Sequence, residues 1–541
     1  MAQMIFARPD GQWFDFPALS MAAMSGDRLI LPTKLDLIPL PEGATLTMMP
    51  LAHPIGFDEE SGEYLELAEN PYKKDDEPVY AVAALLPQGF TRLMLPAATL
   101  AEEPLPLLGY TAVGIEKGRL VVAAAATDEH RRWHPKYYNS PRLEQLVQQR
   151  LDEFPDNRII RQLSRCALEY GCFTAQNVFY RRWEGGIPAS PTCNAACLGC
   201  ISEQPEDQCA SPQQRIRFCP QSQEIAQLAV AHLEQADHAM VSFGQGCEGE
   251  PSLAYPVICD ALREIRRRTQ RGIININTNA GNTTAIRALL DAGMDSLRVS
   301  MFSPLAEDYC AYHRPKDYSF DDVCASLQAA KDAAVPVSLN LLSYPGFTDD
   351  EQQCRALVEL VRKYNIRLIQ FRNLNCDPRL MLDFCRDKNP MGMRTLIRQL
   401  NYELPEVRLG NYSHDLKDAE ADAQFVEPLM DFGFAPPSRK PDHSGKPDYH
   451  GKPVHHGDKP KQGAKPHHSD KPDYHGKPVH HGDKPKQGAK PHHSDKPKQG
   501  AKPHHSDKPK QGAKPHHGDK PKQGNRDKSG QAQHNKTRNK K

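Results

Sequence analysis

The stretch IININTNAGNTTAIRALLDAGMDSLRVSMF, residues 273–302, holds two short apolar runs on either side of an amphipathic segment. The runs IININTN and SLRVSMF have the length and composition of strands. In TTAIRALLDAG the apolar residues recur at three- and four-residue steps, which indicates a helix. A helix between two such strands joins them in parallel, because a crossover helix covers an otherwise exposed face of the sheet. The stretch therefore predicts a parallel α/β sheet.

The same alternation continues on both sides of this unit. In chain order the predicted helix–strand pairs are EIAQLAVAHLEQA with HAMVSFG, VICDALREIRRRTQ with IININTN, TTAIRALLDAG with SLRVSMF, FDDVCASLQAAKDA with PVSLNLLS, and DDEQQCRALVELVRKY with RLIQFRNL. A first strand is predicted near GGIPAS, residues 185–190. This count predicts a partial (β/α) barrel of about six units over residues 185–375.

The segments around this core have other patterns. Residues 1–135 carry β-branched or apolar runs separated by Pro, Gly and acidic residues, and IEKGRLVV predicts a hairpin that turns at Gly118. We expect a β-rich domain there, with a role in packing or recognition. Residues 136–184 predict a helical connector, because SPRLEQLVQQRLDEF and NRIIRQLSRCALEYG have helical periodicity. Residues 376–435 are assigned to a C-terminal extension.

Residues 436–541 form a low-complexity tail. The unit KPDYHGKPVHHGDKPKQGAKPHHSD occurs twice in succession, and 16 of the 23 histidines lie in this tail. From residue 439 onward there are 26 Lys and Arg against 10 Asp and Glu, so the net charge of zero combines an acidic body with a basic tail. With almost nothing apolar to bury, the tail is predicted to be disordered. It is either a passive solvated segment, a site for a divalent metal such as nickel, zinc or copper, or a site for a polyanion.

The sequence also favours a location in the cytoplasm. The N-terminus has no basic region followed by an apolar core, and no stretch approaches the roughly 18 apolar residues that cross a bilayer. We therefore expect a cytoplasmic protein without a membrane partner. In a reducing cytosol, the 14 cysteines indicate metal or cluster chemistry, or buried thiols, rather than disulfides.

Three of the cysteines lie within eight residues, in PTCNAACLGCISEQ at 191–204. Their spacing is C-x3-C-x2-C, in a loop that follows the first predicted core strand. Structural zinc takes four ligands, and Cys209 or Cys219 would have to supply the fourth. A 4Fe–4S cluster normally takes one thiolate per iron, so Cys193, Cys197 and Cys200 would leave one iron open to another ligand.

This motif, ahead of a (β/α) repeat, resembles the signature of the radical S-adenosylmethionine (radical SAM) superfamily. The resemblance implies that the three cysteines hold a 4Fe–4S cluster whose open iron binds the amino and carboxylate groups of S-adenosylmethionine. It also implies reductive cleavage of that cofactor to methionine and a 5′-deoxyadenosyl radical, which abstracts hydrogen from an unknown substrate. The expected partners are an electron donor, such as flavodoxin or ferredoxin, and that substrate.

Further stretches add to the resemblance. FGQGCEGEPSL, residues 243–253, is similar to the G-G-E-P element of the family, which implies that Gly249 and Glu250 hold the methionine amino group. Glu248 stands where the family usually has its first glycine. At the predicted strand ends, Asn279 in NINTNAG and Ser300 in LRVSMFS match cofactor-binding positions, although each is also explained by a loop hydrogen bond.

Arg314, in YCAYHRPKDYSF, is a candidate for a carboxylate of the cofactor or the substrate, since a guanidinium can grip a carboxylate with two hydrogen bonds; a surface salt bridge is the alternative. Cys376 and Cys385 raise the question of an auxiliary cluster, perhaps with Cys209 and Cys219, but no second cluster pattern is evident. Two other functions stay open: a nickel- or zinc-handling protein that acts through its histidine-rich tail, and an RNA-modifying relative that anchors RNA on the basic tail.

Overall fold

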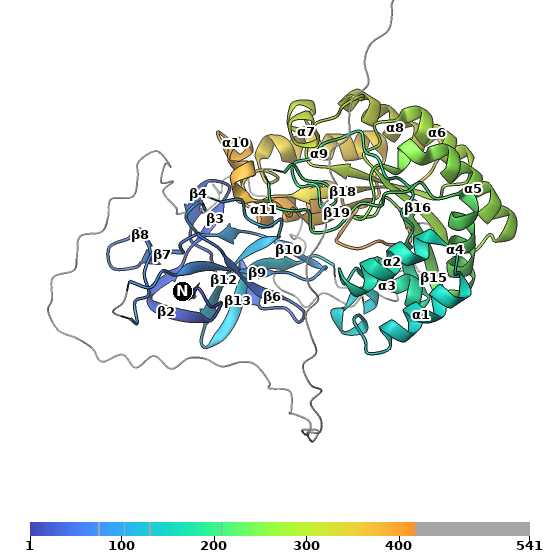
Figure 1. The fold of residues 1–541 in the computed structure, drawn as a ribbon. Coiled ribbons are helices and arrows are strands. Elements are labelled where there is room, and N and C mark those ends of the chain that lie inside the picture. Colours follow the sequence, from blue (N-terminus) through green and yellow to red (C-terminus); the bar gives the residue numbers. More distant parts are fainter. Residues whose placement is uncertain (74–75, 102, 129–130, 207, 417–541) are drawn as a thin grey trace, which may run out of the picture. The chain divides into compact units, whose positions relative to one another are not determined.

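The computed structural model describes residues 1–73, 76–101, 103–128, 131–206 and 208–416 (Figure 1). All of these residues belong to one compact unit. The tail predicted to be disordered, at 436–541, lies outside the described residues. Within the described ranges, no helix has both the length and the apolar character needed to cross a membrane.

The N-terminal domain is β-rich, as the sequence predicts. Its strands are β1 (Gln3–Ala7), β2 (Trp13–Met21), β3 (Ala23–Ser25), β4 (Arg28–Ile30), β5 (Leu37–Pro39), β6 (Thr45–Met49), β7 (Ile55–Asp58), β8 (Glu63–Glu66), β9 (Tyr80–Leu85), β10 (Phe90–Arg92), β11 (Leu95–Pro96), β12 (Tyr110–Glu116) and β13 (Arg119–Ala126).

Ten of these strands form one antiparallel sheet within the described residues, and β11, β3 and β4 form a small second sheet. The predicted hairpin is confirmed, because β12 pairs with β13 across a two-residue turn. Lys117 and Gly118 in that turn have φ values of 51° and 73°, the left-handed conformations that a tight hairpin turn requires.

A helical connector follows. Two of its helices, α1 (Leu143–Glu153) and α2 (Arg158–Leu168), match the predicted ones. The side chain of Asn157 caps α2 by accepting hydrogen bonds from the main-chain N–H groups of Ile159 and Ile160. A third helix, α3 (Phe173–Tyr180), was not predicted from the sequence; it spans only eight residues.

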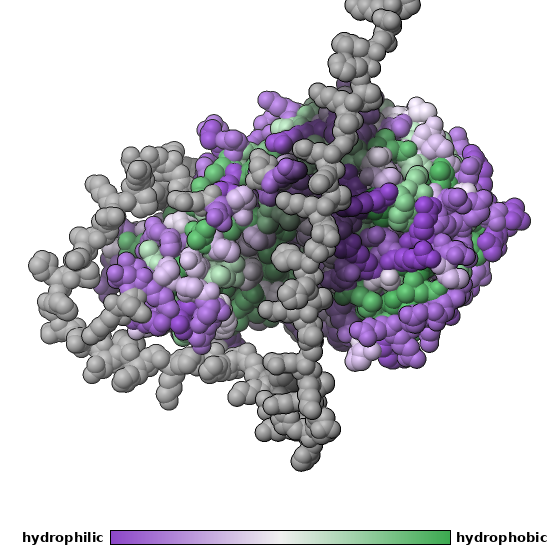
Figure 2. Space-filling view, viewed as in Figure 1, coloured by the Kyte–Doolittle hydropathy of each residue, from purple (hydrophilic) through white to green (hydrophobic). Residues whose placement is uncertain are grey.

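The core is a parallel sheet with helices on its outer face. The strands are β14 (Arg182–Gly186), β15 (Asp237–Phe243), β16 (Ile273–Thr278), β17 (Ser296–Met301), β18 (Val337–Ser343), β19 (Leu368–Asn373) and β20 (Arg408–Gly410). The helices are α4 (Ser222–Gln235), α5 (Tyr255–Arg268), α6 (Thr283–Asp291), α7 (Ala306–His313), α8 (Phe320–Asp332), α9 (Glu351–Tyr364), α10 (Leu382–Cys385) and α11 (Met393–Glu403). Figure 2 shows that hydrophilic residues predominate on the outer surface of this helical layer.

The strands pair in chain order, from β14 to β20, into a seven-stranded parallel sheet within the described residues. The sequence predicts about six units, and the seventh strand, β20, lies beyond residue 375, in the segment assigned to the C-terminal extension. It is only three residues long, too short to leave a pattern.

The two faces of this sheet differ in polarity. Ile274, Ile276 and Leu297 are fully buried under the helices. The alternate positions carry polar side chains, such as Asn277 on β16 and Asn340 on β18. A parallel sheet that is covered by apolar layers on both sides has strands that are apolar throughout. The alternation means that the inner face of the curled sheet surrounds a polar space.

The segment after β20 connects the two edge strands of this sheet. The Ser413 hydroxyl donates to the Glu184 carboxylate on β14, and the Arg298 guanidinium on β17 donates to Ser413 Oγ at 2.6 Å. Glu184 also pairs with Arg298 at 3.2 Å. These buried contacts bridge the gap between the first strand and the last.

The N-terminal domain contacts the core at the carboxyl end of β19. The main-chain N–H of Arg92 donates to Asn373 Oδ1 at 2.8 Å, and its buried guanidinium donates to the carbonyl of Leu374 at 3.1 Å. The main-chain N–H of Leu105 donates to Asp377 at 3.0 Å. The domain is therefore fixed at the end of the barrel where the strands of such folds present their active-site loops.

Candidate functional site

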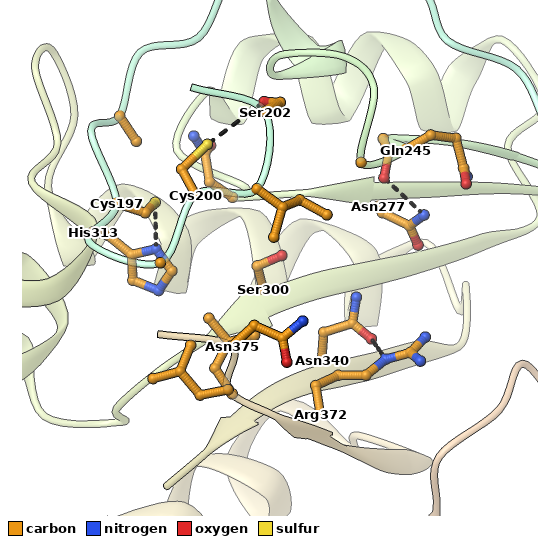
Figure 3. A pocket seen from close by; sticks show the side chains of 18 of the residues that line it. Cys197, Cys200, Ser202, Gln245, Asn277, Ser300, His313, Asn340, Arg372 and Asn375 are labelled. Carbon is orange, nitrogen blue, oxygen red and sulfur yellow. Dashed lines mark hydrogen bonds between the residues drawn. The ribbon is translucent and has the colours of Figure 1, made fainter. Parts of the chain in front are cut away.

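A cavity of about 590 Å³ lies at the carboxyl ends of the core strands (Figure 3). The N-terminal domain supplies one wall with residues 86–88 and Phe90. The residues that line it from the core include Cys193, Cys197, Cys200, Gly249, Glu250, Asn277, Thr278, Asn279, Ser300, His313, Asn340 and Arg372. The cavity thus gathers seven of the eight site residues that the sequence predicts; the exception is Arg314.

The three cysteines of the C-x3-C-x2-C motif face this cavity together. All three are partly buried, and burial raises the pKa values of the Cys193 and Cys197 thiols. No three His, Cys, Asp or Glu side chains of the described residues converge on one point as ligands of a single ion would. Thiolates that each bind a different iron of a cluster do not have to converge in that way. The donor set therefore fits a cluster with three protein ligands.

His313 lies directly against the motif. Its Nδ1 is 3.2 Å from Cys197 Sγ, and the ring is fully enclosed, which lowers its pKa to about 3 and keeps it neutral. Its buried Nε2 has no hydrogen-bond partner within the described residues. The neighbouring Arg314 ends α7 in a left-handed conformation with φ of 48°, and its side chain is exposed. The arginine that the sequence singled out thus points away, and the adjacent histidine faces the cavity.

The cysteine loop is held by main-chain hydrogen bonds to its neighbours. The N–H groups of Ala196 and Leu198 donate to the carbonyls of His313 and Tyr312, at 3.1 and 3.2 Å. On the other side, the N–H of Glu250 donates to the carbonyl of Thr192 at 2.8 Å. The loop that carries the thiols is therefore anchored from two directions.

Glu248, the residue that departs from the family pattern, has a structural role of its own. Its buried carboxylate accepts hydrogen bonds from four main-chain N–H groups: Ala189 at 2.7 Å, Ser190 at 3.0 Å, Gly244 at 2.6 Å and Gln245 at 2.8 Å. Burial raises its pKa to about 7, while these four donors favour the charged form. The side chain joins the loop after β14 to the loop after β15.

Gly249 is required by the close approach of these two loops. A Cβ atom at this position would lie 2.0 Å from the carbonyl oxygen of Thr192, directly before the first cysteine. Glu250 follows, fully enclosed, and burial raises its pKa. Its carboxylate accepts hydrogen bonds from Thr278 Oγ1 at 2.5 Å and from the N–H of Asn279 at 2.8 Å.

Asn279 and Ser300 also face the cavity. The Asn279 side chain donates to Asn194 Oδ1 at 2.8 Å, so the end of β16 is tied to the cysteine loop. Figure 3 shows Ser300 between the cysteines and a polar group formed by Asn340 and Arg372. The sequence analysis did not predict Asn340, Arg372 or Asn277 as residues of this cavity. The alternation of polar with apolar residues along β16, β18 and β19 is the signal that would have found them.

The other cysteines lie outside this cavity. Cys376 and Cys385 are buried in a hydrophobic cluster with Tyr344 and Met381, and their thiol pKa values are raised by burial. Cys219 is exposed on the surface. Cys247 is buried beside Cys166, with which it shares a hydrogen bond.

The chain was compared with known protein families, sequences and solved structures. Residues 187–358 match the model of the radical SAM superfamily. Similar solved structures include methylornithine synthase PylB (14% identity, 49% of this chain and 78% of that chain, TM-score 0.31). A radical SAM methyltransferase from Sphaerobacter thermophilus (14%, 45% and 70%, TM-score 0.32) and Streptococcus suis SuiB bound to S-adenosylmethionine (11%, 52% and 63%, TM-score 0.30) are also similar. No curated protein sequence matches the chain.

Proposed function

We propose that this chain, in which residues 187–358 match the radical SAM superfamily model, is an enzyme that cleaves S-adenosylmethionine reductively and removes hydrogen from a substrate held in the barrel. Members of this superfamily use a 4Fe–4S cluster and S-adenosylmethionine, and these are the cofactors of the domain. The observation that carries the proposal is that Cys193, Cys197 and Cys200 line one cavity, with no fourth cysteine among its described lining residues.

Each of the predicted site residues has its own role in this proposal. The three cysteines hold the cluster and leave one iron open, and Glu250 with Gly249 receives the methionine amino group. Asn279 and Ser300 contact the rest of the cofactor, since both lie on the same cavity. Arg314 is left out, because its side chain is exposed and does not line the cavity.

When bound, the two cofactors supply an electron and a carbon radical that takes hydrogen from the substrate. The protein's own part is to orient the reacting groups and to exclude water and other hydrogen donors. Residues 86–88 and Phe90 of the N-terminal domain contribute to this second purpose, because they line the same cavity as the cysteines. The two tail-based functions have no support in the described residues, since both depend on a segment outside them.

The proposal is tested by anaerobic reconstitution of the full chain with iron and sulfide, followed by reduction with dithionite in the presence of S-adenosylmethionine. We expect a brown protein that releases 5′-deoxyadenosine and methionine in equal amounts. The exposed Cys219→Ala is the matched control and should behave as the wild type, whereas Cys197→Ala should release nothing above background. A colourless zinc protein, or product release that is equal in both variants, would contradict the proposal. Truncation before residue 440 should leave the release unchanged.

A further inference from the structure

The inner face of the sheet carries an excess of positive charge away from the cysteines. Arg298 on β17 and Arg372 on β19 both line a second cavity, of about 320 Å³, which shares Asn277, Asn340 and Arg372 with the main one. Glu184 also lines it, and it is the carboxylate that pairs with Arg298, at 3.2 Å. Two guanidinium groups, the buried Arg298 and the half-buried Arg372, therefore line this cavity, and only Arg298 forms an ion pair with its carboxylate within the described residues.

Of the two arginines, Arg372 is the one that forms no ion pair within the described residues. Its Nε donates to Asn340 Oδ1 and its Nη2 to Gln370 Oε1, both at 3.3 Å, and no ion pair involves it within the described residues. A guanidinium has five N–H donors in a fork that matches a carboxylate or phosphate. Burial, together with the charge of Arg298, lowers its pKa to about 10, which leaves it charged at neutral pH. Arg298 adds a buried Nε that has no partner in the described part of the chain.

A cation removed from water without a direct ion pair is costly, and proteins usually place a carboxylate in contact with it. Glu184 and Asp128 influence Arg372 through their charges, but no ion pair joins either of them to it within the described residues. The side chains that accept hydrogen bonds from Arg372 are neutral amides, and Arg372 lines the cavity (Figure 3). Figure 3 shows Cys197 and Cys200 across that cavity from Arg372, and Cys193 and Glu250 line the same cavity. The space thus has an end suited to the cluster and a cationic amino-acid cofactor, and an opposite end suited to an anion.

We propose that the substrate of this enzyme carries a carboxylate or phosphate group that binds Arg372, with its uncharged part extending past Asn340 and Asn277 toward the cysteine loop. That the bound anion is the enzyme's substrate rests on the proposed function. The existence of the anion site does not depend on that function. Asn side chains both donate and accept hydrogen bonds, so the remainder of the substrate is polar rather than a hydrocarbon chain.

The anion site is tested by calorimetric titration of the reconstituted full-length protein, loaded with S-adenosylmethionine. The probes are inorganic phosphate, glutarate and the uncharged glutaramide. We expect at least one of the anions to bind and glutaramide not to bind. Arg372→Gln should raise the dissociation constant of the anion about tenfold or more, because a charge-assisted bidentate contact is lost. Arg367→Gln, at an exposed arginine directly before β19, is the matched control and should change nothing.

A second variant keeps the test valid if Arg372→Gln does not fold. Asn340→Asp places a carboxylate where an amide oxygen now accepts from Arg372 Nε at 3.3 Å. This variant should weaken binding of the anion by a similar factor, because the guanidinium would gain an internal counter-ion. Failure of both anions to bind the wild type, or equal binding by the wild type and the folded variants, would overturn the inference.

The cofactor's own carboxylate is the main competitor for Arg372. If Arg372→Gln abolishes binding of S-adenosylmethionine, the guanidinium belongs to the cofactor and the inference is wrong. If anions bind through Arg372 but the wild type releases no 5′-deoxyadenosine on reduction, the proposed function fails and the anion site stands.

Discussion

Replacing Glu248 with glutamine should loosen the loop that carries the cluster ligands. Each carboxylate oxygen accepts two main-chain N–H groups: Oε2 from Ala189 and Ser190, and Oε1 from Gly244 and Gln245. Glutamine retains one acceptor oxygen and turns an NH2 group toward the other pair of donors. Hydrogen bonds to a charged group contribute about 1.5–3 kcal/mol each, and relief from burying the charge offsets part of the loss. We expect the free energy of unfolding to fall by about 3 kcal/mol.

The assay is chemical denaturation of the cluster-free protein, followed by iron analysis after reconstitution. Glu248→Gln should unfold at lower denaturant and should take up less iron, because the loops after β14 and β15 are no longer joined. Glu359→Gln, an exposed residue of α9, controls for the loss of a surface charge. If Glu248→Gln matched this control in both measurements, the carboxylate would not be the joint between the two loops.

Three further changes test other parts of the structure. Cys197→Ala should abolish cluster binding while the N-terminal domain stays folded, as iron analysis and circular dichroism would show; unchanged iron content would count against the ligand set. Gly249→Ala should reduce stability by about 2 kcal/mol and impair cluster uptake, because its Cβ would lie 2.0 Å from the Thr192 carbonyl oxygen; a denaturation curve like that of the wild type would show that the loop yields freely. Burial alone would raise the pKa of Asp128, but the hydrogen bond and charge of His414, 2.6 Å away, hold it below 3.8. This stabilising contribution is therefore present above pH 3.8 and is lost as the pH falls through the lowered pKa. Asp128→Asn should cost about 3 kcal/mol at pH 7 and progressively less as the pH falls below 3.8; a gap that does not change with pH would refute this.

The main features of the fold follow from local patterns in the sequence. The alternating apolar runs and amphipathic helices predict the parallel sheet, because each helix covers one face of it. The hairpin at Gly118 follows from its turn residues. The three-residue strand β20 and the eight-residue helix α3 could not be found in this way, because elements so short leave no periodicity.

The sequence predicts candidate site residues where spacing carries chemistry. Cys193, Cys197 and Cys200 were singled out by their spacing, and Gly249 and Glu250 by the likeness of their loop to a family element; all five line the cavity. Arg314 was chosen for its side-chain chemistry, but it is exposed at the end of α7, and the neighbouring His313 lines the cavity instead. Which of two neighbouring side chains faces a cavity depends on the tertiary packing of the helix end, which residue type alone does not reveal.

The central claim is that one iron of the cluster has no protein ligand and is open to S-adenosylmethionine. Electron–nuclear double resonance on the reduced, reconstituted protein tests it directly, with the cofactor labelled by 15N at the amino group and 17O at the carboxylate. We predict magnetic coupling of both labels to the cluster in the wild type. A cluster whose spectrum is the same with and without the labelled cofactor would show that S-adenosylmethionine does not bind its iron, and would contradict the account.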